Sequence, residues 1–125
     1  MEKANLPAGL YALDDVHHAW LFPRVSAVVH HGGSGTTGAG LRAGAPSVLV
    51  PHLGDQPFWA RRVAELGVGP QPVARRQLTA QRLAEAITRA VTDTGIQERA
   101  RSFGERIRAE DGIGQAVEIL EGRNP

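Results

Sequence analysis

Residues 25–40 read VSAVVHHGGSGTTGAG, and this stretch decides the predicted fold. It begins with an uncharged, largely β-branched run at 25–29, which predicts a strand buried on both faces. A glycine-rich turn follows. Residues 36–43 form a short segment rich in small side chains, which predicts a helix. Gly44 and Pro46 follow it, and both residue types are common at helix ends. Strand, glycine turn and helix in this order predict part of a parallel βαβ unit.

The same alternation continues on both sides of that unit. Further apolar runs predict three more strands, at residues 9–13, 47–50 and 68–73. Helical patterns cover four more stretches, at residues 57–66, 79–92, 96–107 and 113–120. The predicted fold is therefore α/β, with a partial Rossmann-like parallel sheet of three to four strands flanked by helices. Pro70 and Pro72 predict that the last strand either lies at an edge or ends early. Doubly wound sheets usually have more strands, so we expect some that complete this one to lie outside the chain.

Composition excludes several classes of protein. The 125 residues suit one small domain, and 14 Lys and Arg against 13 Asp and Glu give a net charge of +1. Such a balance predicts no nucleic-acid partner. The chain has no Cys, which excludes disulfide scaffolds, thiolate catalysis and Cys-ligated zinc. No apolar run approaches the roughly 20 residues that span a bilayer, so we expect no transmembrane segment and a cytoplasmic location.

The glycine turn has the chemistry of an anion site. Nine of the 15 glycines lie between Gly32 and Gly69. The first turn of a helix leaves backbone N–H groups unpaired and positively polarised, and glycines let a phosphate approach the backbone. Side chains of the turn that could donate to a phosphate oxygen are His30, His31, Ser34, Thr36 and Thr37. The alternative is a tight turn whose glycines serve only the packing of helix on sheet.

The sequence of this turn can be compared with two nucleotide-binding motifs. Residues 33–38 match GxGxxG, and Asp55 lies 20 residues after Gly35, which keeps a dinucleotide-binding module as an alternative. Against that alternative, Asp55 follows Pro51 on a loop rather than standing at a strand end. No GxxxxGK[ST] motif occurs, so a P-loop ATPase is excluded.

A second loop, PHLGDQPFW at 51–59, leaves the neighbouring predicted strand at the same edge of the sheet. Its Asp55 and Gln56 put a carboxylate beside a carboxamide, a pair that can hold vicinal hydroxyls. Alternatively, Asp55 caps the helix that begins at Gln56 or Pro57. Adjacent histidines on a strand point to opposite faces, and no Asp pair is clustered, so no metal site is predicted.

Three segments carry a resemblance to a known family. Residues 20–46, 50–59 and 65–70 resemble the donor-binding signature of nucleotide-sugar glycosyltransferases of the GT-B fold. The likeness is to sterol 3β-glucosyltransferases and to bacterial antibiotic and macrolide glycosyltransferases, and residues 110–117 are similar to the tail of the sterol enzymes. It extends over about residues 8–120. The resemblance implies that residues 1–125 are the C-terminal portion of a donor domain, without its first strands and without the acceptor domain.

The resemblance also implies roles for individual residues. The donor diphosphate would be bound by His31, Gly33, Ser34, Gly35 and Thr36. The sugar hydroxyls would be held by Asp55 and Gln56, and the nucleoside would lie near Val16 and His18. Ala39 stands where plant relatives carry a Glu that binds the ribose, which leaves ribose recognition unexplained.

The implied activity is inverting hexosyl transfer from UDP-glucose or a similar UDP-sugar to a lipid, sterol-like or natural-product hydroxyl. The donor is a substrate, and neither a cofactor nor a metal is implied. The base that deprotonates the acceptor would come from the absent domain, so this chain would hold no catalytic residue. Alone it would bind UDP weakly and transfer nothing. The alternatives are the dinucleotide module and a non-catalytic subunit that completes its sheet with another chain, including self-association through an exposed strand edge.

Overall fold

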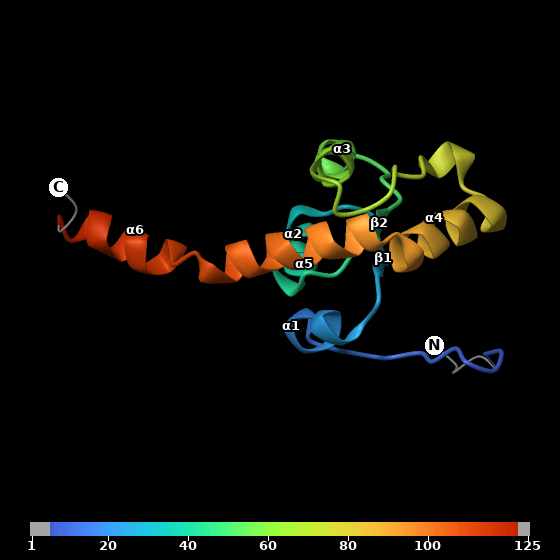
Figure 1. The fold of residues 1–125 in the computed structure, drawn as a ribbon, viewed down its shortest axis with the longest axis horizontal. Helices are drawn as coiled ribbons and strands as arrows, with labels where there is room; N and C mark the ends of the chain where they lie inside the picture. Colours follow the sequence, from blue (N-terminus) through green and yellow to red (C-terminus); the bar gives the residue numbers. More distant parts are fainter. Residues whose placement is uncertain (1–5, 123–125) are drawn as a thin grey trace.

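The computed structural model describes residues 6–122, in which two short strands alternate with helices (Figure 1). In chain order the elements are α1 (His18–Leu21), the 3-10 turn η1 (Phe22–Arg24), β1 (Val28–His30), α2 (Ser34–Ala43), β2 (Ser47–Leu49), α3 (Gln56–Leu66), the 3-10 turn η2 (Arg75–Gln77), α4 (Ala80–Thr92), α5 (Thr94–Ala109) and α6 (Gly112–Leu120).

The sheet is parallel and is narrower than predicted. β1 and β2 pair with Val28 opposite Ser47, and these two are the sheet's strands within residues 6–122. Residues 68–73 run along the other side of β2. There the Ser47 N–H donates to the Val68 carbonyl at 3.2 Å, and the Val73 N–H donates to the Leu49 carbonyl at 2.9 Å. This segment therefore occupies the place of a third strand. Its two prolines have no N–H with which to continue the pairing.

The other predicted strand, at 9–13, does not form. Most of residues 6–20 are exposed, and no described strand lies beside 9–13. A strand needs a partner for its backbone N–H and C=O groups, so an apolar run alone is not enough to form one. The expectation that 25–29 is buried on both faces was also wrong: Val28 is buried, but Val29 is 45% exposed.

β1 presents an unpaired edge. The Val28 N–H donates to the Pro46 carbonyl, and the His30 carbonyl accepts from the Val50 N–H, each at 2.9 Å. Both bonds face β2. Backbone groups on a strand alternate in direction, so the N–H and C=O of Val29 face the opposite side, where none of the described strands pairs with them.

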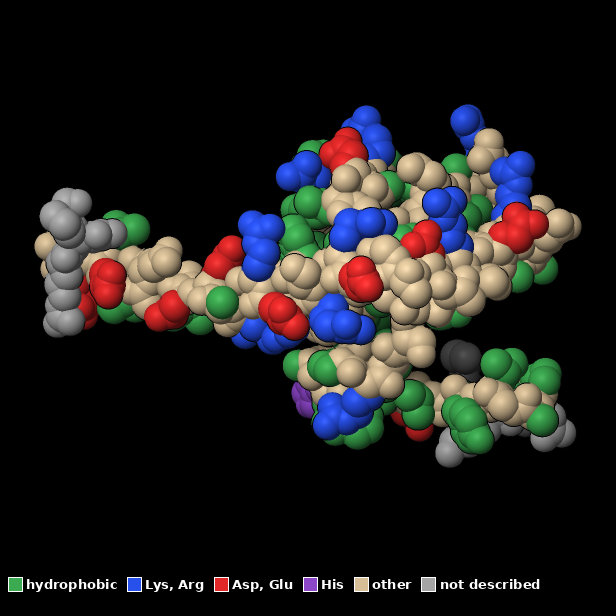
Figure 2. Space-filling view, in the orientation of Figure 1, with side chains coloured by type: hydrophobic (Ala, Val, Ile, Leu, Met, Phe, Trp, Pro, Cys, Tyr) green, Lys and Arg blue, Asp and Glu red, His purple; other side chains and the backbone are tan. Residues whose placement is uncertain are grey.

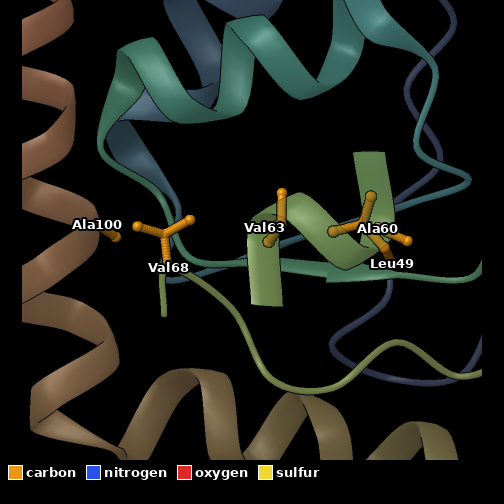
Figure 3. Close-up of a cluster of buried hydrophobic side chains, with 5 residues drawn as sticks. All are labelled: Leu49, Ala60, Val63, Val68 and Ala100. Carbon is orange, nitrogen blue, oxygen red and sulfur yellow. The ribbon is translucent and has the colours of Figure 1, made fainter. Parts of the chain in front are cut away.

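Helices cover both faces of β2, as expected of a doubly wound sheet. On one face, Val48 packs with Ala86 and Ala90 of α4. On the other, Leu49 joins α3 and α5 in a core made of Leu49, Ala60, Val63, Val68 and Ala100 (Figure 3). The packed body thus fixes β2 firmly and presents the carboxyl ends of β1 and β2 together.

Two segments extend from this body. α6 continues beyond α5 and away from the sheet, and residues 6–17 run out below α1 (Figure 1). Both carry exposed apolar side chains, and residues 110–121 contain four acids and no Lys or Arg (Figure 2). Within residues 6–122, no helix combines the length and apolar character needed to cross a bilayer.

Candidate functional site

The first turn of α2 is open to an anion. The helix begins directly after the glycine turn with Gly33 at its N-cap, where no side chain makes a capping hydrogen bond, and its first turn has no acidic residue. The Thr37 N–H donates to the Gly33 carbonyl at 2.9 Å. The three N–H groups before it, those of residues 34–36, have no intrahelical carbonyl to bond. An uncapped N-terminus carries partial positive charge, so this end of α2 can bind a phosphate.

His31 lies against that turn. Its Nε2 is only 2.7 Å from the point that a Cβ would occupy at Gly33, so glycine at this position leaves room for the ring. The side chain is otherwise exposed and accessible to a ligand. The structure thus brings His31 next to Gly33, and the other residues of the predicted set, Ser34, Gly35 and Thr36, form the first turn of the helix that follows.

His30 is placed differently from His31. Its Nδ1 accepts a hydrogen bond from the Gly32 N–H at 3.1 Å, and its Nε2 is buried without a partner among the described residues. Burial, and after it the nearby rings of His31 and His18, lowers the pKa of His30 from 6.5 to about 4. The ring is therefore neutral at pH 7 with its proton on Nε2. Of the two histidines, His31 is the one presented to a phosphate.

The Asp55–Gln56 loop is held by its own side chains. Gln56 Oε1 accepts from the N–H groups of His52, at 2.8 Å, and Leu53, at 3.1 Å. Asp55 precedes α3 but makes no capping bond; its Oδ2 accepts instead from the Trp59 indole N–H at 2.9 Å. Among described residues, Asp55 Oδ1 and Gln56 Nε2 have no partner. One acceptor and one donor therefore remain unused on two consecutive residues, the two kinds of group that can hold vicinal hydroxyls.

The glycine turn and this loop touch each other. Gly32 has a φ of +94°, a conformation that favours glycine. A Cβ there would lie 2.9 Å from Leu49 Cδ2 and 3.2 Å from the Gln56 carbonyl oxygen. The anion site and the Asp55–Gln56 pair are therefore neighbours at the carboxyl ends of β1 and β2, where open parallel sheets bind their ligands.

The predicted nucleoside residues lie on the α1 side of the site. The His18 ring stacks on Phe22 with centroids 4.4 Å apart, and its effect on His30 places it near the turn. Val16 is half-buried. Beside α1, a cavity of about 320 Å³ is lined by Ala19, Pro23, Ala39, Arg42, Ala43 and Arg108. Ala39, the expected ribose position, thus faces open space. Arg108 reaches this cavity from α5, 66 residues beyond Arg42, and its side chain donates a hydrogen bond to the Arg42 carbonyl.

Titratable side chains do not gather into a metal site in the part of the chain that the structure describes: no three His, Asp or Glu side chains there are arranged to hold an ion.

Comparisons with known proteins show the family of the chain. Residues 1–121 match the profile of the family described as Erythromycin biosynthesis protein CIII-like, C-terminal domain. A sterol 3-beta-glucosyltransferase of Cryptococcus neoformans is 49% identical over 119 residues, which is 95% of this chain and 7% of that protein. One from Arabidopsis thaliana is 46% identical over 111 residues, 89% of this chain and 17% of its own length. The chain thus spans a small part of its relatives.

A solved structure shares the fold. The crystal structure of glycosyltransferase VinC in complex with dTDP superposes with a TM-score of 0.77 at 30% identity. The match covers 94% of this chain and 31% of VinC.

Proposed function

The chain belongs to the Erythromycin biosynthesis protein CIII-like C-terminal domain family, and from that premise we propose that it binds the nucleotide-sugar donor of a glycosyltransferase. It is homologous to sterol 3-beta-glucosyltransferases, as the sequence predicted, and the GT-B fold prediction is confirmed. The observation that carries the proposal is the uncapped N-terminus of α2 beneath the His31 ring. The donor's diphosphate would lie there.

In this proposal the site acts on the charge that the leaving group gains. When the bond between the sugar C1 and the diphosphate oxygen breaks, its electron pair stays on the nucleoside diphosphate. The N–H groups of α2, the His31 ring and the Thr36 hydroxyl would stabilise that charge more strongly in the transition state than in the bound donor. The acceptor hydroxyl would be deprotonated by a base outside this chain, with inversion at C1. None of these steps requires a metal or a cofactor.

The proposal also assigns positions to the sugar and the nucleoside of the donor. Asp55 Oδ1 would accept from one sugar hydroxyl while Gln56 Nε2 donates to its neighbour. The nucleoside would lie on the α1 side, with backbone near Val16 at the base and His18 beside it. We propose UDP-glucose or a similar UDP-sugar, because the curated relatives are named as glucosyltransferases. VinC, with its bound dTDP, makes thymidine the competing nucleoside to test.

The partners of the site are also proposals. The acceptor would be a lipid, sterol-like or natural-product hydroxyl held by a separate domain. The unpaired edge of β1 is where the remaining strands of a donor domain, or a second copy of this chain, would pair. A cytoplasmic location stays a prediction, as does the assignment of all 125 residues to one donor-domain portion.

Calorimetric titration of the chain with UDP tests the proposal, with dTDP and NADH as competing ligands. We expect His31→Ala to weaken UDP binding about tenfold or more, the value of a hydrogen bond to a charged group. His52→Ala is the matched control, because that exposed ring bonds only the Val50 carbonyl and UDP lacks the hexose that would meet its loop. Unchanged affinity in His31→Ala would remove the central assignment. Tighter binding of NADH than of UDP would favour the dinucleotide alternative, and steady sugar transfer by the isolated chain would refute the placement of the base elsewhere.

A further inference from the structure

We infer that His30 is a positioning residue, which holds the glycine turn and the Asp55–Gln56 loop at a fixed spacing. The inference rests on the proposed function, since the two loops matter together only if one donor bridges them. It concerns a residue that need not touch the donor itself.

The first observation is that His30 is anchored at two points. Its carbonyl accepts from the Val50 N–H at 2.9 Å, which ties it to the end of β2. Its ring Nδ1 accepts from the Gly32 N–H at 3.1 Å, which ties the turn back onto the strand. The ring thus acts as a short brace across the beginning of the glycine turn.

The second observation is what lies on the other side of Gly32. With its φ of +94°, this residue packs so closely on the Leu49 side chain and the Gln56 carbonyl that no Cβ fits. The Gly32 peptide is therefore held between the His30 ring and the first residue of α3. Loss of the ring's acceptor would let the turn shift relative to Gln56, and the diphosphate site would shift relative to the sugar site.

The third observation concerns the state of the ring. Accepting at Nδ1 requires a neutral imidazole with the proton on Nε2, and that N–H is buried without a partner among residues 6–122. A buried donor that lacks a partner costs free energy. An apolar ring would pack here without that cost. The feature that distinguishes histidine from such a ring is its Nδ1, which accepts the hydrogen bond from the turn. Because Nδ1 is taken by the Gly32 N–H and Nε2 is buried, neither ring nitrogen is exposed to a phosphate at the surface.

Two variants separate the acceptor from the ring's volume. His30→Phe keeps a planar ring and removes the acceptor, whereas His30→Asn keeps an acceptor oxygen near the Nδ1 position. We expect His30→Phe to weaken UDP binding about tenfold and His30→Asn by less than about threefold. The preference for UDP-glucose over UDP should fall in His30→Phe as well. A purely structural role would move binding and melting temperature together; we expect the melting temperature of His30→Phe to stay close to that of the wild type, because removal of the buried Nε2 donor offsets the loss of the acceptor for the Gly32 N–H.

Nitrogen NMR of the wild-type ring gives a readout that needs no variant. We expect the Nε2–H tautomer from pH 8 to pH 5, with His31 and His18 as the titrating groups that face it. A ring that titrates with an ordinary pKa near 6.5, or that carries its proton on Nδ1, would overturn the inference, even if both variants fail to fold. Wild-type affinity in His30→Phe, or equal losses in Phe and Asn variants that are both folded, would also overturn it. Failure of the wild type to bind UDP or dTDP would instead refute the proposed function.

Discussion

Replacing Gly33 with alanine should weaken donor binding without destabilising the chain. Gly33 has φ −58° and ψ 143°, which alanine adopts freely. The added methyl would lie 2.7 Å from His31 Nε2, too close for both to stay in place. Since the ring is the end of an exposed side chain, it can swing away, and the helix and strand behind it need not move. The expected structural change is therefore displacement of His31 from the first turn of α2.

The magnitude follows from the contact that is lost. A hydrogen bond from an imidazole to a charged phosphate is worth about 1.5–3 kcal/mol, so the dissociation constant for UDP should rise about 10- to 100-fold. Binding should not vanish, because the N–H groups of α2 remain. Stability should hold or increase by about 0.4–1 kcal/mol, because alanine restricts the unfolded chain.

Calorimetry with UDP on four proteins checks this: the wild type, Gly33→Ala, His31→Ala and the double variant. If the methyl acts through the ring, adding Gly33→Ala to His31→Ala changes nothing further. Gly38→Ala serves as the control, because Gly38 also lies in α2 and a methyl there would meet nothing within 4 Å. Its UDP affinity should equal that of the wild type.

Two results would refute the reasoning. Wild-type affinity in Gly33→Ala would mean that His31 does not contact the phosphate from its observed place. Full additivity in the double variant would mean that the methyl blocks the ligand directly and that the ring is not involved.

Three further predictions follow from the packing and charge of the described residues. Gly69→Ala should cost about 3 kcal/mol or more in urea unfolding, because its Cβ would overlap the Ser47 carbonyl, while Gly112→Ala, with nothing within 4 Å, should not. Gln56→Leu should erase most of the preference for UDP-glucose over UDP and leave UDP affinity unchanged; an equal loss for both ligands would contradict the sugar-loop assignment. Folding stability should fall as pH drops from about 6.5 towards 4, because the unfolded chain protonates His30 in that window and the folded chain, with a pKa of about 4, does not. Urea unfolding at pH 7.5 and pH 5 should show a smaller drop for His30→Phe than for the wild type.

Local signals were sufficient to predict the helices from α2 to α6, whereas the four-residue α1 was not predicted. The pattern at 79–92 predicted α4 almost to its ends, and Thr79 caps it by accepting from the Arg82 N–H at 3.2 Å. α2 begins two residues earlier than predicted, because Gly33 starts the helix without a capping side chain to mark it. The strands were predicted less well because pairing is non-local: the apolar run at 9–13 has no described neighbour, and no pattern within the run could reveal that.

The candidate site was predictable only where it depends on local sequence. The glycine spacing and the neighbouring histidines pointed to an anion site, and the structure sets His31 against the helix N-terminus. The sequence could not predict which side-chain atoms bond within the protein and which remain available to a ligand. The Gln56 side-chain oxygen accepts a hydrogen bond within its own loop, and Asp55 accepts one from the Trp59 indole. Both bonds depend on how the loop folds. The contact between Gly32 and Gln56, on which the spacing of the two loops depends, joins residues 24 positions apart.

The two sides of the small sheet differ in a way that limits how copies can assemble. Beyond β2, the bordering segment contains Pro70 and Pro72, which offer no N–H for a further strand. Beyond β1, Val29 leaves its backbone groups open. The β1 side is therefore the more open of the two to strand addition. Two copies that met edge to edge, β1 against β1 about a twofold axis, would use up both open edges, so the assembly would close as a dimer and could not grow into a fibre.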